Sequence, residues 1–397
     1  MKLSLTDQPD EFYREKTVLV RVDFNVPIRD GNVEDDYRIR SSIPTIEYLS
    51  SRGAKVILAS HLGRPGGRRD LKASLKPVFE RLKDLMLGRN IRWADDCVGP
   101  EAEAAKKNLR PGEILLLENL RFHPGEEEND EEFSRSLSSL ADIYVNEAFS
   151  ASHRKHSSTY GAPTLIEHRL AGLQLKKELE YLTKIRDEPD KPFILVVGGL
   201  KIYDKIDALK RLIDKADKVL IGGCIAYTFL ASKGVSTGDS LVERDFLDWA
   251  GKISSQDKIV LPEDHLATST VKDLKDVKVV RGSIPTGMSG FDIGPSTLQR
   301  FTSIVSSASG TVFWNGPMGV FEVREFAGGT LGLAYSIALA YFRGASTVIG
   351  GGDTVSAFLK AGVRETEVSH LSTGGGASLE YIGGKDLPGI EILNNRL

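Results

Sequence analysis

The feature that most constrains the fold is a series of short apolar runs separated by segments of helical periodicity. The runs are TVLVRVDFN, AKVILASH, EILLLEN, ADIYVNEA, FILVVGG, DKVLIGG, KIVLPED, GTVFWNG and STVIGGG. Their nearly continuous Val, Ile and Leu content is typical of strands buried on both faces of a parallel sheet. Residues 41–52, 74–87 and 204–215 carry the helical pattern between such runs. This alternation predicts βαβ units with right-handed crossovers, and therefore the α/β class.

Length and composition narrow the class of protein further. A chain of 397 residues, 41% hydrophobic and 27% charged, favours a packed globular protein of roughly two or three domains. A net charge of −3 argues against a surface that wraps nucleic acid. Acidic residues appear too early for a secretory signal, and no apolar run approaches the roughly 18 residues of a membrane span. Two cysteines, Cys97 and Cys224, fit a reducing compartment. We expect a cytoplasmic protein without nucleic-acid or membrane partners.

A long amphipathic segment in the middle of the chain suggests a boundary between two domains. Leu175, Leu179 and Leu182 recur at helical spacing within IEHRLAGLQLKKELEYLTKIRDEPDKP. An ordinary surface crossover helix would have the same pattern. We place the boundary here because a new series of apolar runs begins at Phe193.

Ligands of open parallel sheets bind beyond the carboxyl ends of the strands. In the first half of the chain, Arg, His, Asp and Asn recur at those ends, namely Asp23, Asn25, Arg38, His61, Arg64, Arg121, His153 and Arg154. A single arginine is more often a solvated loop charge, but recurrence after successive strands favours an anion pocket. The two histidines could each bond a turn carbonyl, and we favour hydrogen bonding to the anion over metal binding or base catalysis.

Two glycine triplets, 350–352 and 374–376, each lie between an apolar run and a helical segment. Glycine allows close backbone approach, and the following helix start offers unpaired N–H groups to phosphate. Neither stretch carries the P-loop lysine. The turn at Gly198 and Gly199 supplies Lys201 and Lys205 instead, although exposed helix lysines, Lys205 above all, would look the same.

Two carboxylates in the second half have alternative interpretations. Asp353 follows the first triplet and could be a helix N-cap, or could bind Mg²⁺ together with nucleotide phosphates. Glu322 could accept hydrogen bonds from ribose hydroxyls or be a plain surface residue.

The order of the motifs resembles the phosphoglycerate kinase family over nearly the whole chain. The motifs are VRVDFNVP, SHLGRP, LLLENLRFHPGEE, VNEAFSASHR, GGLKIYDKI, FWNGPMGVFE, GGGDT and STGGGASLE. The resemblance implies two Rossmann-like domains, each with a mainly parallel sheet flanked by helices, joined by a long connecting helix. The expected parts are a triose-phosphate-binding domain at 1–167, the helix at 168–186, a nucleotide-binding domain at 187–382 and a segment at 383–397 that returns to the first domain.

The resemblance also implies the site residues by motif position. The triose-phosphate site would contain Asp23, Asn25, Arg38, His61, Arg64, Arg121 and Arg154. The nucleotide site would contain Gly198, Gly199, Lys201, Lys205, Gly222, Gly223, Asn315, Glu322, Gly351, Gly352, Asp353 and Thr354. The catalytic set would be Arg38, Lys201, Gly352, Gly375 and Gly376, with Mg²⁺ held by Asp353.

The implied reaction is reversible, Mg²⁺-dependent phosphoryl transfer between 1,3-bisphosphoglycerate and ADP, giving 3-phosphoglycerate and ATP in glycolysis and gluconeogenesis. Hinge closure and charge stabilisation would suffice for catalysis, because the nucleophile is an ionised carboxylate and needs no general base. A monomer acting on these small molecules is expected. The chain departs from the family pattern at Glu147, Leu200 and Ser296, which leaves loop detail and nucleotide contacts open.

Two other functions are open to a chain with two α/β domains. A NAD-dependent oxidoreductase needs Gly-x-Gly-x-x-Gly after a first strand, and neither triplet has that spacing. A non-catalytic sugar-phosphate or nucleotide-binding protein would not need Arg38, Lys201 and Asp353, all of which are present.

Overall fold

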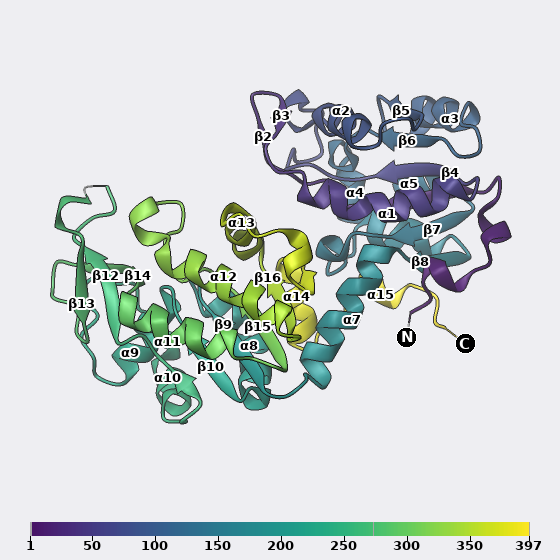
Figure 1. Ribbon diagram of the computed structural model, residues 1–397. Coiled ribbons are helices and arrows are strands. Elements are labelled where there is room, and N and C mark those ends of the chain that lie inside the picture. The colour runs from purple at the N-terminus through teal and green to yellow at the C-terminus, as the bar shows by residue number, and fades with distance from the viewer. Residues whose placement is uncertain (1, 273, 397) are drawn as a thin grey trace. The chain divides into compact units, whose positions relative to one another are not determined.

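The chain folds into two compact units. The computed structural model describes residues 2–272 and 274–396. Unit 1 comprises the residues up to Leu179 together with those from Asp386 onward, and unit 2 comprises Glu180–Lys385. Within each unit the strands lie side by side and helices pack around them (Figure 1).

Unit 1 contains a six-stranded sheet of order β5-β6-β4-β1-β7-β8, in which every strand pair is parallel. Its strands are β1 Thr17–Arg21, β4 Lys55–Ala59, β5 Ile91–Ala94, β6 Ile114–Leu117, β7 Ile143–Asn146 and β8 His168–Ala171, and β2 Ile28–Arg29 with β3 Asn32–Val33 forms a hairpin. Its helices are α1 Tyr37–Ser51, α2 Lys76–Leu85, α3 Gly99–Lys107, α4 Pro124–Glu128, α5 Glu131–Ser138, α6 Ala162–Thr164 and α15 Pro388–Glu391. All five residues of β1 are buried, as a continuous apolar run in a covered sheet requires.

Unit 2 contains a second parallel sheet of six strands, ordered β11-β10-β9-β15-β16-β17. Its strands are β9 Phe193–Val197, β10 Lys218–Ile221, β11 Ile259–Val260, β15 Thr311–Asn315, β16 Ser346–Gly350 and β17 His370–Leu371. A separate antiparallel sheet, β13-β12-β14, consists of β12 Asp264–Thr268, β13 Lys278–Arg281 and β14 Ser289–Ile293. The helices are α8 Ile206–Lys215, α9 Ile225–Ser232, α10 Leu247–Ser254, α11 Pro295–Ser306, α12 Gly328–Phe342, α13 Gly352–Lys360 and α14 Gly376–Ile382. The predicted architecture of two mainly parallel α/β domains is confirmed.

The helix expected from residue 168 begins later, at α7 Leu173–Asp187. Residues 168–171 form β8 instead and pair with β7 in parallel register, Ile143 opposite His168 and Asn146 opposite Ala171. The prediction was wrong for these residues because their sequence, HRLA, has too few apolar positions to separate an edge strand from a helix start.

The segment from Asp386 onward packs on unit 1 through backbone hydrogen bonds. The N–H of Leu3 donates to the carbonyl of Asn394 at 2.7 Å, and the N–H of Asn394 donates to the carbonyl of Arg169 at 2.9 Å. The side-chain amide of Asn146 donates to the carbonyl of Gly389 at 2.8 Å. The chain therefore leaves unit 1 through α7, forms unit 2, and then returns to complete unit 1.

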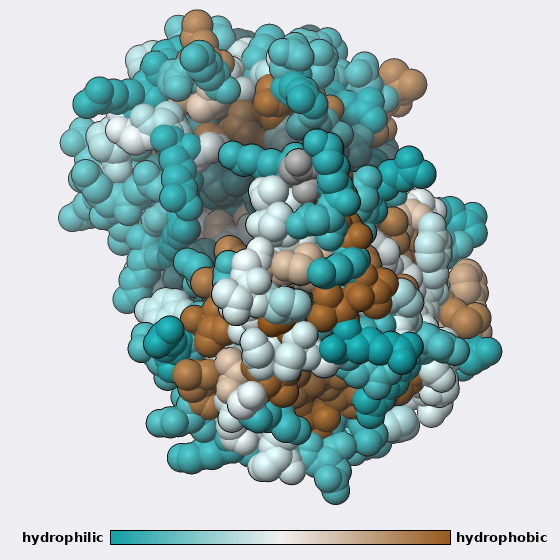
Figure 2. All heavy atoms as spheres, turned by 90° about the vertical axis from the view of Figure 1, so that its left-hand side faces the viewer, coloured by the Kyte–Doolittle hydropathy of each residue, from teal (hydrophilic) through white to brown (hydrophobic). Residues whose placement is uncertain are grey.

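Helix α12 is the most apolar of the long helices and lies between α11 and α13 in the packing of unit 2. Leu333 and Ile337 are fully buried, whereas Tyr335 and Phe342 are 58% and 65% exposed. Figure 2 shows the end of unit 2 that carries β12–β14, where brown apolar areas interrupt the polar surface. Among residues 2–272 and 274–396, neither α12 nor any other helix is long and apolar enough to cross a membrane.

Candidate active site

The polar edge of unit 1 lies at the carboxyl ends of adjacent parallel strands. Because β6, β4, β1 and β7 are neighbours in that order, the residues that follow them meet at one edge of the sheet. Asp23 follows β1, His61 follows β4, and Arg121 follows β6 in a short 3-10 helix, Leu120–Phe122. This edge carries most of the residues that the sequence assigned to the triose-phosphate site.

Asp23 and Arg38 form an ion pair at the centre of this edge. Arg38 lies in the first turn of α1, and its Nη1 donates to Oδ2 of Asp23 at 2.6 Å. The same nitrogen reaches the carbonyl of Asn25 at 3.3 Å, while the N–H of Asn25 donates to Oδ1 of Asp23 at 3.1 Å. Ser150, after β7, donates its hydroxyl to Asp23. Burial alone would raise the pKa of Asp23, but the charge of Arg38 and the hydrogen bond from Ser150, helped by the charge of Arg21, outweigh it and hold the pKa below its ordinary value.

Arg121 and Asn25 tie neighbouring loops to the turn at Gly63. Nη1 of Arg121 donates to the carbonyl of Gly63 at 2.8 Å, and the N–H of Gly63 donates to Oδ1 of Asn25 at 2.9 Å. Arg121 is only 5% exposed, and its Nε lies 3.2 Å from Oε1 of Glu127. Burial lowers the pKa of Arg121, partly opposed by Glu127. The loops after β1, β4 and β6 are therefore held as one structure.

The remaining residues of this set are placed less tightly. Nε of Arg154 donates to Nε2 of His153 at 3.0 Å, and the charge of Arg154 acts on Arg121. Arg64 is exposed on the turn after β4, and within the part of the chain that the structure describes it has no hydrogen bond or ion pair. Arg64 is thus available to a ligand but is not preorganised by the protein.

Sequence reasoning missed a buried network beneath this edge, formed by Arg21, Glu126 and Ser158. Arg21 ends β1 and is 1% exposed; its Nε donates to Oγ of Ser158 at 2.7 Å. Ser158 donates its hydroxyl to Oε1 of Glu126 at 2.6 Å, and Glu126 is fully buried. The available signal was a charged residue inside an otherwise apolar run, since a buried arginine needs partners.

Unit 2 contains a cavity of about 250 Å³ at the carboxyl ends of β9, β15 and β16. Its lining residues are Gly199, Leu200, Lys201, Asp204, Lys205, Asn315, Gly316, Pro317, Gly351, Gly352, Asp353, Thr354, Gly375, Gly376 and Leu379. The cavity brings together both glycine triplets, both lysines and Asp353. It does not include Gly198, Gly222, Gly223 or Glu322.

Of the glycines outside the cavity, Gly198 and Gly223 lie where two backbones approach closely, and Gly222 packs against the side chain of Met318. A Cβ on Gly198 would lie 2.2 Å from the carbonyl oxygen of Pro317, and one on Gly223 would lie 2.5 Å from the backbone nitrogen of Gly199. These positions shape the floor of the site without facing its cavity. Glu322 is exposed on a turn before the 3-10 helix Arg324–Phe326, and nothing in the described residues directs it toward the cavity.

Glycine is required at the starts of α13 and α14. Gly351, which precedes α13, has φ +93°, and Gly375, which precedes α14, has φ +53°. A Cβ on Gly352 or Gly376 would meet nothing within 4 Å, so open space lies beside both helix starts. Unpaired backbone N–H groups of the first helical turn are therefore accessible beside the cavity, as phosphate binding requires.

The two lysines of the cavity differ in how they are held. Nζ of Lys205 donates to the carbonyl of Gly198 at 2.8 Å, and burial lowers its pKa to about 8 although Asp353 and Asp204 oppose the shift. Lys201 is exposed and lines the cavity from the turn after Gly199. Lys205 thus supports the turn, while Lys201 can reach a ligand.

Asp353 fits the role of a Mg²⁺ ligand. It is exposed in the first turn of α13, lines the cavity, and acts electrostatically on Lys205. Mg²⁺ is commonly held through one or two carboxylates together with nucleotide phosphates and water. An accessible carboxylate beside two glycine-led helix starts meets that requirement, and Asp204 is a second exposed carboxylate in the lining.

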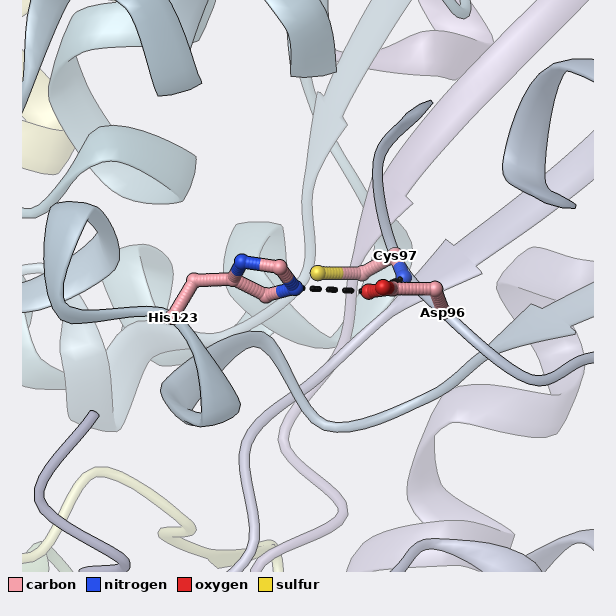
Figure 3. A group of neighbouring side chains, drawn as sticks. All are labelled: Asp96, Cys97 and His123. Atoms are coloured by element: carbon pink, nitrogen blue, oxygen red, sulfur yellow. Dashed lines mark hydrogen bonds and ion pairs between the residues drawn. The ribbon is translucent and has the colours of Figure 1, made fainter. Parts of the chain in front are cut away.

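A second cluster of potential metal ligands lies elsewhere in unit 1. Asp96 and Cys97 follow β5, and His123 follows the 3-10 helix that carries Arg121; Figure 3 shows the three side chains together. Nε2 of His123 lies 2.6 Å from Oδ1 of Asp96, which also accepts the N–H of Cys97 at 2.7 Å. Burial raises the pKa of the Cys97 thiol well above its ordinary value, which opposes thiolate formation. We interpret the cluster as a hydrogen-bonded tie between two loops.

The departures from the family pattern have separate structural roles. Leu200 lines the cavity and is 59% exposed. Ser296 lies at the start of α11, where its N–H donates to Oδ2 of Asp264 at 2.9 Å, outside the cavity. Glu147 is buried and accepts hydrogen bonds from first-turn N–H groups of α7, at 3.1 Å from Gln174 and 3.3 Å from Leu175. Burial raises the pKa of Glu147 to about 8.

The chain is similar to known proteins of one family. The family model described as phosphoglycerate kinase matches residues 9–385. A phosphoglycerate kinase of Desulforudis audaxviator is 50% identical over 96% of this chain and 97% of its own length, and one of Pseudothermotoga lettingae is 48% identical over 96% of each. The solved structure of phosphoglycerate kinase from Pyrococcus horikoshii OT3 superposes with a TM-score of 0.85 at 30% identity, covering 98% of both chains. That from Coxiella burnetii gives 0.82 at 35% identity, covering 99% of this chain and 98% of its own.

The fold and these relatives define the class: a kinase built from two α/β units. The chain belongs to the phosphoglycerate kinase family.

Proposed function

We propose that the protein transfers a phosphoryl group reversibly between 1,3-bisphosphoglycerate and ADP, giving 3-phosphoglycerate and ATP, in glycolysis and gluconeogenesis. The observation that carries this proposal is the cavity of unit 2, where two glycine-led helix starts, an exposed lysine and two exposed carboxylates converge. The arginine-rich edge of unit 1 supports it as the site for a small, multiply anionic substrate.

The residues divide between the two ligands. Asp23, Asn25, Arg38, His61, Arg64, Arg121 and Arg154 would bind the triose phosphate. The cavity residues Gly199, Lys201, Lys205, Asn315, Gly351, Gly352, Asp353 and Thr354 would bind the nucleotide. Gly198, Gly222 and Gly223 would shape that site by close packing, and Glu322, which does not line the cavity, would meet a ribose only beyond it.

In the direction that consumes ATP, a carboxylate oxygen of 3-phosphoglycerate attacks the γ-phosphorus while the bond to the β–γ bridging oxygen breaks. The nucleophile is already ionised near neutral pH, so no side chain has to accept a proton. Lys201, Arg38 and the backbone N–H groups at Gly352, Gly375 and Gly376 would stabilise the charge of an in-line transition state. A Mg²⁺ ion on Asp353 would supply further charge neutralisation at the nucleotide phosphates.

Each unit carries the proposed site of one ligand, so direct transfer requires both ligands to reach a common reaction centre. We propose that hinge closure achieves this and excludes water during transfer. A cytoplasmic monomer that acts only on these small molecules fits the proposal.

The decisive experiment is a coupled assay with ATP, Mg²⁺ and 3-phosphoglycerate, read as formation of 1,3-bisphosphoglycerate. Turnover that requires all three supports the proposal. Binding of ATP or 3-phosphoglycerate without turnover would indicate a non-catalytic binding protein, and NAD-linked oxidation in their absence would indicate an oxidoreductase.

A further inference from the structure

The buried guanidinium of Arg21 contacts a histidine of the proposed triose-phosphate site. Arg21 is 1% exposed and His61 is 7% exposed. Nη2 of Arg21 lies 3.1 Å from Nδ1 of His61. The other donors of the same guanidinium bond the hydroxyl of Ser158 and the carbonyl of Val22. Arg21 is thus fixed on several sides, and its contact with His61 does not depend on a mobile side chain.

This contact determines which ring nitrogen of His61 carries a proton. A guanidinium is permanently charged and has only N–H donors, so Nδ1 of His61 must act as the acceptor. A neutral imidazole with an acceptor at Nδ1 carries its proton at Nε2. We propose that Arg21 is a positioning residue that keeps His61 neutral, with Nε2–H free to donate to an anionic oxygen of the substrate.

The charge of Arg21 is balanced inside the protein and not by the ligand. The hydroxyl of Ser158 accepts from Nε of Arg21 and donates to Oε1 of Glu126 at 2.6 Å. The backbone N–H of Ser158 donates to Oε2 of Glu126 at 2.9 Å. Glu126 is fully buried and acts electrostatically on Arg121 as well. The bridge through Ser158 lets a buried cation remain in place while the site is empty.

The charges around His61 also oppose protonation of the ring. Arg21 on β1, Arg121 after β6 and Arg38 on α1 all disfavour the imidazolium, and Asp23 after β1 favours it. Burial together with the three arginines outweighs Asp23 and lowers the pKa of His61 well below its ordinary value. His61 therefore offers a hydrogen-bond donor among arginines without adding another positive charge.

This role rests on the proposed triose-phosphate site, but the state of His61 can be measured without any ligand. Long-range ¹H–¹⁵N correlation spectra of the full-length protein, labelled with ¹⁵N-histidine, report each ring nitrogen; His61→Gln identifies the signals. We expect an unprotonated Nδ1 and a protonated Nε2 that do not titrate between about pH 5 and 8, where an ordinary histidine changes charge. A protonated Nδ1, or titration of His61 inside that range, would overturn the proposal using the unmodified chain alone.

Substitution at Arg21 tests whether this residue sets the protonation state of His61. Arg21→Met removes the charge and the donors at similar volume, so the pKa of His61 should rise toward its ordinary value and both neutral tautomers should be present. Arg21→Lys retains a cationic donor and should restore the unprotonated Nδ1. The matched control is Arg92→Met, which removes an arginine of β5 that pairs with Glu113 and should leave the His61 signals unchanged. An unchanged His61 spectrum in folded Arg21→Met would contradict the proposal.

Kinetics connect the state of His61 to the substrate. In Arg21→Met, KM for 3-phosphoglycerate should rise about tenfold, as expected when one hydrogen bond to a charged group weakens. The ratio of that KM to the KM of the unmodified protein should also change between about pH 5 and 8, whereas the ratio for Arg21→Lys should not; the substrate phosphate, which titrates near pH 6, affects all three proteins alike. A KM ratio that is raised but does not change with pH would indicate a merely structural role. Absence of turnover in every variant, including the unmodified chain, would count against the proposed function and leave the spectroscopic result standing.

Discussion

Nη1 of Arg38 donates to Oδ2 of Asp23 at 2.6 Å, and Asp23 is almost completely buried. The pair fixes the guanidinium of Arg38 in the first turn of α1. Only Nη1 bonds Asp23, so the other two nitrogens of the guanidinium do not contact that carboxylate. An ion pair that is shielded from water on one side restricts Arg38 to a narrow set of orientations, which suits a residue that must meet a transition state.

Arg38→Lys should retain the positive charge and lose the planar guanidinium with its several N–H donors. We expect kcat/KM for 3-phosphoglycerate to fall about 10- to 100-fold, because lysine cannot hold Asp23 and a substrate oxygen in the same geometry. Steady-state kinetics in the ATP-consuming direction measure this. Arg40→Lys on the same helix, where Arg40 pairs with Asp36, is the control and should behave like the unmodified protein. Equal losses in both variants would contradict the role of Arg38.

Lys201→Ala should lower kcat about 100- to 1000-fold, the loss seen when one preorganised transition-state donor is removed. Binding of Mg-ADP, measured by calorimetry, should change much less, because backbone groups and Asp353 remain. Lys210→Ala, an exposed position on α8, serves as the control. A normal kcat in Lys201→Ala would exclude Lys201 from the chemical step.

Arg64→Ala should act mainly on the triose substrate. Because Arg64 is exposed and has no fixed partner in the described chain, its removal should not affect folding. We expect KM for 3-phosphoglycerate to rise about tenfold with little change in kcat. Arg68→Ala in the same exposed loop is the control, and an unchanged KM in Arg64→Ala would contradict the assignment.

Asp353→Asn should increase the Mg²⁺ concentration needed for half-maximal activity, since an amide is a weaker ligand for a hard cation than a carboxylate. Calorimetry should show that the variant loses most of the preference for Mg-ADP over metal-free ADP. Asp214→Asn, exposed at the end of α8, is the control. An unchanged Mg²⁺ dependence would remove Asp353 from the metal site.

The raised pKa of Glu147 predicts that the free energy of unfolding depends on pH. Its folded-state pKa of about 8 lies above the ordinary 4.5, so the folded state binds the extra proton between these values. Stability from this group is therefore present below about pH 4.5 and is lost as pH rises to about 8, with a slope of at most about 1.4 kcal/mol per pH unit. Glu147→Gln should consequently gain in relative stability over the same range. Urea unfolding at several pH values measures the difference in free energy of unfolding between the two proteins. A difference that does not change with pH would contradict the prediction.

The apolar runs were sufficient to predict both parallel sheets, because strands buried on two faces leave a strong signal. Strands β5 and β8 were missed. Ile91–Ala94 reads IRWA and His168–Ala171 reads HRLA, and such short edge strands need little apolar surface. Each pairs with a consecutive strand of the chain, β6 or β7, but the pairing lies outside the local pattern of four residues that a sequence reading of the strand uses.

The sequence also identified the residue types that surround the cavity of unit 2, because glycine triplets and lysines follow the strands directly. It could not distinguish residues that face the cavity from those beneath it. Gly199 lines the cavity and Gly223 packs below it, although both follow a strand in a Gly-Gly pair. Likewise, Arg21 has the local pattern of a strand residue, and only the distant Ser158, Glu126 and His61 reveal why it is charged.

The return of the chain to unit 1 has a consequence for biosynthesis. The carbonyl of Gly389, which accepts from Asn146, leaves the ribosome only after all of unit 2 has been translated. The N-terminal part of unit 1 is therefore synthesised some two hundred residues before its last segment. During that time the side-chain amide of Asn146 lacks this acceptor. Nascent chains stalled before Asp386 should expose this incomplete surface to chaperones, even though the parallel sheet of unit 1 has already been synthesised.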